Sequence, residues 1–277
     1  MLQMEIETLA IVGVGLIGAS IGAAAKSHGV ARRVVGIDTN PEHLRTALAN
    51  QFIDVAVETV KNADFIVVCV PVDQIAERVI DAAHVVPSNA AITDAGSTKG
   101  RIVDAVNRHS IGNFVGSHPM AGSEKKGPAH ARADLFHDRP VILTPTLRTD
   151  ELLTQRVGAF WQQLGARVVH MTPESHDRAV AAVSHLPHVV AAALAGQTDP
   201  NLLPLSAGGF RDTTRVAGAG PGIWTPIFRE NRDAVLDALN HFSDHLARFR
   251  ELLAADDGPG LSAWLADAKQ VRDDLGS

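Results

Sequence analysis

Three glycines near the start of the chain have the spacing of a phosphate-binding loop. They form the pattern G-x-G-x-x-G in the segment GVGLIG, which follows an apolar run and precedes a helical pattern. The first glycine permits a tight turn, the second lets the backbone approach a pyrophosphate, and the third allows close helix–strand packing. We therefore expect a dinucleotide, with its phosphates at the helix N-terminus, to contact Gly13, Gly15, Leu16, Ile17 and Gly18.

An acidic residue twenty positions after the last glycine indicates which dinucleotide is bound. Asp38 ends the apolar run VVGID, where a carboxylate accepts hydrogen bonds from the ribose hydroxyls and repels a 2′-phosphate. NAD is therefore favoured over NADP. Val70 and Pro71 end another apolar run and should lie beside the cofactor, because ligands bind at the carboxyl ends of strands. The alternative is a glycine-rich turn with a surface aspartate.

Two later segments carry residues suited to proton transfer. His118, in GSHPMAGSEKK, follows a short apolar run and should emerge near a nicotinamide. A histidine there can take a hydroxyl proton while hydride leaves the same carbon, since its ordinary pKa of about 6.5 suits neutral pH. The alternative is an ordinary loop histidine. In DAGSTK, Ser97 or Thr98 could simply cap a helix.

A third set of polar residues lies in the later part of the chain. His185 and His188, in SHLPH, share a helix face, and Arg215 ends the segment GGFRDTTR. The arginine has the planar fork that suits a carboxylate. Two histidines at this spacing could bind a metal, but there is no H-E-x-x-H pattern and no obvious third ligand. We expect no metal site.

The order of the predicted elements indicates an α/β fold. Strands alternating with helices imply a Rossmann-type, doubly wound, mainly parallel sheet in residues 1–170, the NAD-binding domain. An all-α C-terminal domain, residues 171–277, follows. The predicted strands are 8–12, 33–37, 64–70, 91–93, 114–116, 140–143 and 167–170. The predicted helices between them are 16–28, 41–50, 74–84, 98–108 and 150–164.

The C-terminal part reads as a series of helices. We expect one helix over 173–196, kinked at Pro187, one or two over 223–257, and a last one over 261–275 after a break at 258–260. A heptad-like apolar seam runs along the second region and could be helical core, a subunit interface, or both. Its members are Val235, Leu239, Phe242, Leu246, Phe249 and Leu253.

Composition excludes several classes of protein. Apolar residues make up 45% and charged residues 20% of the 277 residues, as in ordinary globular proteins. The net charge of −6 argues against a nucleic-acid partner. The single cysteine, Cys69, excludes an intrachain disulfide and is expected to be buried. The uncharged stretch 179–198 is interpreted as a helix buried in protein, not a membrane span, and the N-terminus lacks a secretory pattern. We expect a cytoplasmic location.

Five segments in order resemble the prephenate dehydrogenase family. They are GVGLIG, DAGSTK, SHPMAGSEKKG, HDRAVAAVSHLPH, and GGFRDTTRVA followed by IW, between about residues 8 and 250. The resemblance implies NAD-dependent oxidative decarboxylation of prephenate to 4-hydroxyphenylpyruvate in tyrosine biosynthesis. It also implies that the helical domain, residues 171–277, binds substrate and forms a homodimer. Neither a chorismate mutase segment nor an ACT domain is expected, whereas competition by tyrosine at the active site stays possible.

The resemblance assigns roles to particular residues. His118 matches the catalytic histidine that hydrogen-bonds the substrate C4 hydroxyl, and Ser97 matches a serine that contacts this hydroxyl and orients the histidine. Arg215 matches the arginine that binds a substrate carboxylate. The other matched positions line or support the substrate pocket: His185, His188, Glu124, Asp212, Trp224 and Gly208.

Three alternatives remain. An arogenate dehydrogenase, or a cyclohexadienyl dehydrogenase accepting both substrates, would use the same residues. A β-hydroxyacid dehydrogenase usually relies on a lysine in the first helix after the domain boundary, and residues 173–196 contain none. An NAD-binding sensor without catalysis would tolerate loss of His118, Ser97 and Arg215, yet all three are present.

Overall fold

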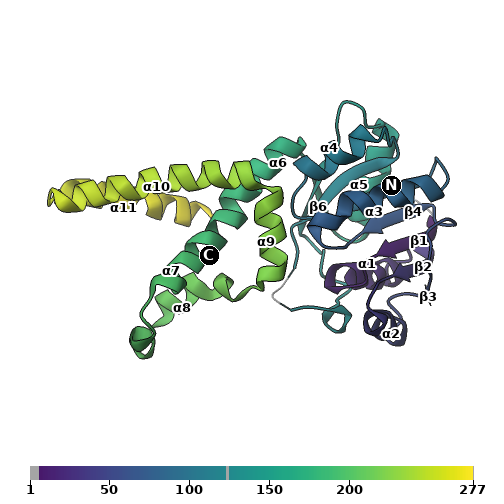
Figure 1. Ribbon diagram of the computed structural model, residues 1–277, viewed down its shortest axis with the longest axis horizontal. Coiled ribbons are helices and arrows are strands. Elements are labelled where there is room, and N and C mark those ends of the chain that lie inside the picture. The colour runs from purple at the N-terminus through teal and green to yellow at the C-terminus, as the bar shows by residue number, and fades with distance from the viewer. Residues whose placement is uncertain (1–5, 123–124, 277) are drawn as a thin grey trace. The chain divides into compact units, whose positions relative to one another are not determined.

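A computed structural model describes residues 6–122 and 125–276 of the chain. Within them, the strands form one eight-stranded sheet in the order β3-β2-β1-β4-β5-β6-β7-β8 (Figure 1). All pairings are parallel except β6 with β7. The strands are β1 Ile6–Val12, β2 Ala31–Ile37, β3 Val55–Ala56, β4 Phe65–Val68, β5 Ala91–Asp94, β6 Phe114–Pro119, β7 Pro140–Thr144 and β8 Arg167–His170.

Helices cover both faces of this sheet, as expected for a doubly wound fold. Apolar residues of α1, α2 and α5 pack in one core, and those of α3 and α4 in another. All four residues of β4 are buried, because a parallel strand between two helical layers is apolar on both faces. The helices of this part are α1 Leu16–Ser27, α2 Pro41–Ala49, α3 Ile75–Val85, α4 Gly100–Arg108 and α5 Glu151–Gln163.

The remaining helices follow β8. They are α6 Pro173–Val180, α7 Leu186–Gln197, α8 Gly208–Thr214, α9 Pro221–Glu230, α10 Arg232–Ala254 and α11 Gly258–Asp274. Short 3-10 turns are η1 Val72–Gln74, η2 Pro128–His130, η4 Pro200–Leu205 and η5 Arg215–Gly218, whereas η3 Ala181–His185 is a π turn. The predicted α/β sheet followed by helices is confirmed.

Several predicted boundaries were wrong. The two-residue strand β3 was missed, since so short a run has no period to detect. The strand β4 ends at Val68, two residues early, because the chain turns away beside Gly13. Residues 258–260 are not a break but the first turn of α11, because Asp257 accepts a hydrogen bond from the Gly260 N–H at 2.9 Å.

The helix expected over 173–196 is interrupted. It runs as α6, the π turn η3, and α7, and Pro187 occupies the first turn of α7, where its missing N–H is tolerated. The span Pro173–Gln197 is long and apolar enough to cross a membrane, and 22% of its most apolar window is buried. The expectation that it lies buried in protein is therefore wrong within a single chain, where its neighbours leave most of it open.

The chain divides into two compact units, residues 1–231 and 232–277. The first holds the sheet and α6–α9, so the compact units do not divide at the predicted boundary near residue 170, although the sheet ends there. The second unit is α10 and α11, in which Trp264 stacks on His245 with ring centroids 4.7 Å apart. Leu246 and Leu253 of the apolar seam are exposed, so the seam is not simply core.

Candidate active site

The glycine loop lies between β1 and α1, and its three glycines meet different surroundings. Gly13 has φ +95°, and a side chain on it would stand 2.7 Å from the carbonyl group of Cys69. A side chain on Gly18 would collide with the carbonyl oxygen of Gly13. At Gly15 nothing lies within 4 Å of the added atom. Gly13 and Gly18 are therefore required by the fold, whereas Gly15 leaves open space at a helix N-terminus, as a dinucleotide phosphate needs.

The other predicted cofactor residues surround this loop. Asp38 accepts hydrogen bonds from the N–H groups of Val14 at 2.8 Å and Asn40 at 2.7 Å, and lies 3.2 Å from His43 Nδ1. A carboxylate so held beside the loop fits a ribose partner. Leu16 and Ile17 form the half-exposed first turn of α1. Val70, half-exposed, and Pro71, exposed, follow β4 where the chain passes Gly13. The observed residues thus fit an NAD site.

Cys69, beside the same loop, is half-exposed and not buried as expected. Surrounding protein and the charge of Asp94 raise the pKa of its thiol, so it stays protonated at neutral pH. It is therefore not a nucleophile, because the thiolate is the reactive form.

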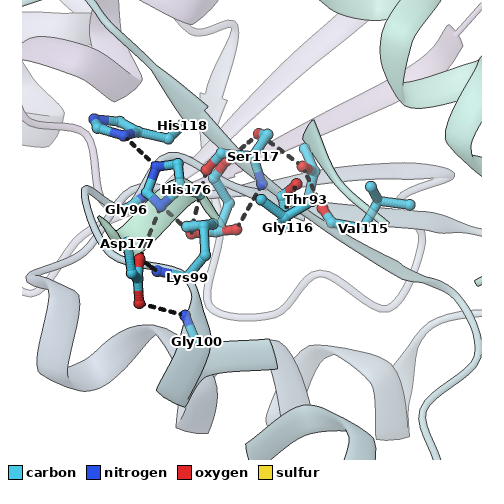
Figure 2. Close-up of polar contacts among 12 residues, drawn as sticks. Thr93, Gly96, Lys99, Gly100, Val115, Gly116, Ser117, His118, His176 and Asp177 are labelled. Atoms are coloured by element: carbon cyan, nitrogen blue, oxygen red, sulfur yellow. Dashed lines mark hydrogen bonds and ion pairs between the residues drawn. The ribbon is translucent and has the colours of Figure 1, made fainter. Parts of the chain in front are cut away.

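His118 lies in β6 and begins a chain of side-chain contacts (Figure 2). Its Nδ1 is 2.8 Å from Nε2 of His176, and Nδ1 of His176 is 2.8 Å from Oδ1 of Asp177. His176 and Asp177 come from α6, and both are buried. Two elements 58 residues apart in sequence thus meet behind the predicted base.

This chain of contacts determines where the protons lie. An ionised carboxylate only accepts hydrogen bonds, so His176 carries a proton on Nδ1 and a lone pair on Nε2. His118 must then donate from Nδ1, which leaves its Nε2 unprotonated. No residue that the structure describes bonds this nitrogen, so it is free to accept a proton from a substrate.

The electrostatics keep both histidines neutral. Burial lowers the pKa of His118 well below 6.5, and charge repulsion with His176, Lys99 and His185 lowers it further, since neighbouring imidazoles disfavour each other's protonation. Burial also lowers the pKa of His176, against the opposing effect of Asp177. Burial alone would raise the pKa of Asp177, but hydrogen bonds from His176 and two backbone N–H groups lower it overall. The neutral base and the ionised acceptor therefore coexist at pH 7.

A buried ion pair supports the strand that carries His118. The Lys99 ammonium contacts the Asp94 carboxylate and donates to the Ser117 carbonyl oxygen at 2.9 Å, and both charged side chains are fully buried. Asp94 also accepts from the Ser117 N–H at 3.0 Å. The Ser117 hydroxyl is held in turn by Trp161 Nε1 at 3.1 Å. These contacts tie the ends of β5 and β6 together.

The alternative interpretation of DAGSTK, a helix cap by Ser97 or Thr98, is wrong. The helix α4 begins at Gly100, and neither Ser97 nor Thr98 caps it. Asp177 instead accepts from the N–H groups of Lys99 and Gly100, each at 2.8 Å. Ser97 is half-exposed, and among the described residues it makes no hydrogen bond to His118, whose Nδ1 is taken by His176.

The two histidines of the second pair, His185 and His188, have different hydrogen-bond partners. His185, at the end of the π turn, is 1% exposed, and its Nδ1 lies 3.1 Å from the Asn231 amide nitrogen. His188 Nδ1 lies 3.1 Å from the carbonyl oxygen of Ser184, and its ring stacks on Trp224 with centroids 3.4 Å apart. Burial lowers the pKa of His185 to about 4. The His185 ring meets the Trp224 indole edge-on, and the His188 ring stacks on it. These three side chains form one cluster, the histidine–tryptophan group.

The remaining predicted substrate residues are more peripheral. Arg215 is exposed on η5, and its charge contributes, after burial, to lowering the pKa of His188. The turn η5 packs against α7, the helix that carries His188. Gly208 and Asp212 are exposed on α8, and among the described residues no hydrogen bond joins them to the histidines. Glu124 lies outside the described residues. Within 6–122 and 125–276, no group of three or more His, Cys, Asp or Glu side chains is arranged so that it could hold a metal ion.

Sequence reasoning missed the residues behind the base. None of these residues was selected: His176, Asp177 and Lys99 were quoted only within longer motifs, and Asn231 was not quoted at all. The available signal was the pair His176-Asp177 just before the long uncharged stretch 179–198, since buried polar residues need partners.

The fold and site define an oxidoreductase that uses a dinucleotide. The strand order through β6 is that of a dinucleotide-binding domain, the glycine loop opens at the usual crevice, and a neutral histidine stands at the carboxyl ends of the strands. Two family models match the chain. "Prephenate dehydrogenase, nucleotide-binding domain" matches residues 21–170, and "Prephenate dehydrogenase, dimerization domain" matches residues 172–267. The chain belongs to the prephenate dehydrogenase family and is an NAD-dependent oxidoreductase.

Individual relatives agree with this assignment. Prephenate dehydrogenase of Bacillus subtilis is 37% identical over 99% of this chain and 77% of that protein. The structure of Aquifex aeolicus prephenate dehydrogenase with hydroxyphenyl propionate and NAD⁺ is 33% identical, with a TM-score of 0.92 over 97% of this chain and 98% of that one. Synechocystis arogenate dehydrogenase is 30% identical, with a TM-score of 0.84 over 97% and 99% of the two chains.

Proposed function

We propose that this chain converts prephenate to 4-hydroxyphenylpyruvate and CO₂, with reduction of NAD⁺, in tyrosine biosynthesis. The observation that carries the proposal is the neutral His118, whose Nε2 is left unprotonated by the contact of its Nδ1 with His176. The family and the substrate named for two of the relatives support the choice of prephenate. NAD⁺, when bound, accepts the hydride from C4.

In this reaction the proton of the C4 hydroxyl moves to His118 and later returns to the same oxygen. His118 Nε2 takes the proton of the C4 hydroxyl as the C4–H bond breaks and the oxygen becomes a carbonyl. The bond between the ring and its carboxylate then breaks, and CO₂ leaves. The electron pair of this bond enters the ring, which becomes aromatic and carries a phenolate oxygen at C4. The phenolate oxygen recovers the proton from His118, so the base is regenerated. In the charged interval, His176 and Asp177 stabilise the imidazolium through the contacts described above.

The cofactor would be held by the glycine loop and its neighbours. Gly15 and the first turn of α1 would receive the pyrophosphate, and Asp38 the ribose. The complete proposed set is Gly13, Gly15, Leu16, Ile17, Gly18, Asp38, Val70 and Pro71. The carboxylate of Asp38 would disfavour NADP, because it repels the 2′-phosphate.

The substrate would be held by the histidine–tryptophan group and nearby residues. Arg215 would bind a carboxylate as a planar, charged donor. His185, His188 and Trp224 would line the pocket beside it. Ser97 would contact the C4 hydroxyl. Glu124, Asp212 and Gly208 complete the proposed set.

Arogenate is the second candidate substrate. The similarity to Synechocystis arogenate dehydrogenase over nearly the whole chain favours it. Both substrates carry the ring carboxylate and the C4 hydroxyl, so His118 and Arg215 would serve either one.

A steady-state assay with each substrate and each cofactor tests the proposal. We expect the highest kcat/KM with prephenate and NAD⁺. A higher kcat/KM with arogenate would transfer the assignment to the second candidate. Absence of turnover with both substrates would overturn it, and the non-catalytic sensor would then stand.

We also propose that two copies of this chain associate through the helical part. The matching family model is described as a dimerization domain, and the exposed apolar residues Val183, Leu246 and Leu253 need cover. Light scattering at micromolar concentration should give twice the chain mass of 29.3 kDa, and a single species of 29.3 kDa would refute the proposed dimer.

We propose a cytoplasmic location, which fractionation of expressing cells would test.

A further inference from the structure

Asn231 ends α9 and makes two side-chain contacts through one nitrogen. Its amide nitrogen donates to the carbonyl oxygen of Asp177 at 2.8 Å and lies 3.1 Å from Nδ1 of His185. Asn231 is 4% exposed, so these contacts are shielded from water. Because a backbone carbonyl only accepts, the atom facing Asp177 must be the NH₂ group, and this fixes the orientation of the amide.

The fixed amide determines the protonation of His185. An NH₂ group only donates, so Nδ1 of His185 must accept and carries no proton. Burial lowers the pKa of His185 to about 4, so the ring is neutral at pH 7, and its one proton lies on Nε2. Among the described residues, no acceptor bonds this Nε2–H. His185 is 1% exposed, and its Nε2 is not among the fully buried, unpartnered side-chain atoms of the described residues, which are Thr98 Oγ1 and Trp264 Nε1, so a bound ligand can accept a hydrogen bond from it.

His188 provides a contrast within the same helix. Its Nδ1 lies 3.1 Å from the Ser184 carbonyl oxygen, so Nδ1 carries the proton and Nε2 is the acceptor. His185 differs from His188 because the Asn231 amide faces its Nδ1. The two neighbouring histidines therefore have opposite tautomers.

The donor on His185 complements the acceptor on His118. The two rings are electrostatically coupled, because protonation of either one would disfavour protonation of the other. His118 presents a lone pair on Nε2, and His185 presents an N–H. Asp177 connects both, through its carboxylate to His176 (Figure 2) and through its carbonyl to Asn231.

We infer that Asn231 is a positioning residue that holds His185 with its proton on Nε2, so that His185 donates a hydrogen bond to an acceptor oxygen of the bound substrate. The inference rests on the proposed function for the identity of that substrate. The tautomer itself is a property of the free protein, so it can be measured without any substrate.

Nitrogen NMR of histidine-labelled protein at neutral pH tests the tautomer. His185 signals are assigned by their loss in His185→Gln. We expect a protonated Nε2 and an unprotonated Nδ1 in the wild type, and a loss of this preference in Asn231→Ala. A wild-type His185 with its proton on Nδ1, or an unchanged tautomer in Asn231→Ala, would overturn the inference. This result holds whether or not prephenate is the substrate.

Kinetics with prephenate test the donor. Asn231→Ala should raise KM about tenfold to a hundredfold, the usual loss for a hydrogen bond to a charged acceptor, with kcat changed less than about threefold. The exposed Asn240→Ala is the matched control and should leave both constants unchanged. If wild-type protein turned over neither prephenate nor arogenate, the proposed function would fail, while the NMR result would still decide the tautomer.

A pair of substitutions separates a donor role from a structural one. The amide nitrogen of glutamine reaches the position of Nε2, whereas that of asparagine reaches Nδ1. His185→Gln should therefore keep KM within about threefold, and His185→Asn should raise it like Asn231→Ala. Adding Asn231→Ala to His185→Gln should have little further effect, because glutamine has no tautomer to lose. Equal losses from Asn231→Ala in both backgrounds would mean that Asn231 acts only on packing.

Discussion

Asp177 accepts a hydrogen bond from the N–H of Gly100 at 2.8 Å, although 77 residues separate them in the chain. The same carboxylate holds His176, which in turn contacts His118. The N-terminus of α4 and the histidine behind the base are thus fixed by one side chain (Figure 2). Any change at Asp177 should therefore affect both the fold and the proton acceptor.

Replacement of Asp177 by asparagine tests this coupling. The carboxamide can no longer accept from His176 and both backbone N–H groups together, so the tautomers of His176 and His118 become mixed. We expect kcat to fall by at least about tenfold, and by up to about 10⁴ as in a serine-protease triad that loses its aspartate. Stopped-flow measurement of NADH formation checks this. An unchanged kcat in folded protein would exclude His176 as the group that orients the base.

His118→Asn keeps a polar group of similar reach but cannot act as a base near neutral pH. General-base assistance contributes about 10² to 10⁴ in rate, so kcat should fall by that factor while NAD⁺ affinity changes little. His84→Asn, on the exposed side of α3, is the matched control. Near-normal kcat in His118→Asn would move the base to another residue.

The pH dependence of kcat/KM follows from the lowered pKa of His118. Burial and neighbouring charges favour the neutral ring, so it remains a base at pH values where an ordinary histidine is protonated. Activity should therefore persist through pH 6.5 and fall only well below it, as imidazolium forms. A profile whose acid limb lies at or above pH 6.5 would contradict this assignment.

Acid should also destabilise the fold through His185. Its pKa of about 4 lies below the value of 6.5 in the unfolded chain, so the unfolded state binds more protons. The contribution of the neutral ring is full above pH 6.5 and is lost progressively as the pH falls towards 4. Urea unfolding across this range should give a shallower decline for His185→Gln than for the wild type.

Lys99→Met tests the buried ion pair beneath β6. It removes the ammonium and leaves the fully buried Asp94 carboxylate unpaired, which costs about 3–5 kcal/mol of unfolding free energy. Arg78→Met breaks the exposed pair with Asp81 and should cost less than about 1 kcal/mol. Chemical denaturation of both variants gives the comparison. Equal small losses would mean that Lys99 is not required to neutralise Asp94.

The glycine loop offers another matched comparison. Gly18→Ala should destabilise the fold, because its methyl group meets the Gly13 carbonyl oxygen, whereas Gly15→Ala should fold normally and raise the KM for NAD⁺. Asp38→Ser should narrow the preference for NAD⁺ by removing the charge that repels a 2′-phosphate. Thermal unfolding and kinetics with both cofactors separate these effects. A wild-type preference for NADP⁺ would show that Asp38 does not exclude the 2′-phosphate.

Local patterns in the sequence were sufficient for most of the sheet. Apolar runs of strand length predicted seven of the eight strands near their observed positions, because alternation of strands and helices is a local signal. The same holds for the glycine loop, since its turn and close packing depend on missing side chains at fixed spacing. His118 and the histidine pair could be selected because each stands in a short, specific segment.

Only the tertiary structure decided how these residues work together. The partner of His118 comes from α6, the cap of α4 is Asp177 instead of Ser97 or Thr98, and Asn231 meets His185 across 46 residues. The π turn that ends at His185 also rotates the residues after it about the helix axis, so helical periodicity alone assigns them to the wrong face. Contacts of this kind depend on how helices pack against the sheet, and that packing has no signature in the spacing of residues along the chain.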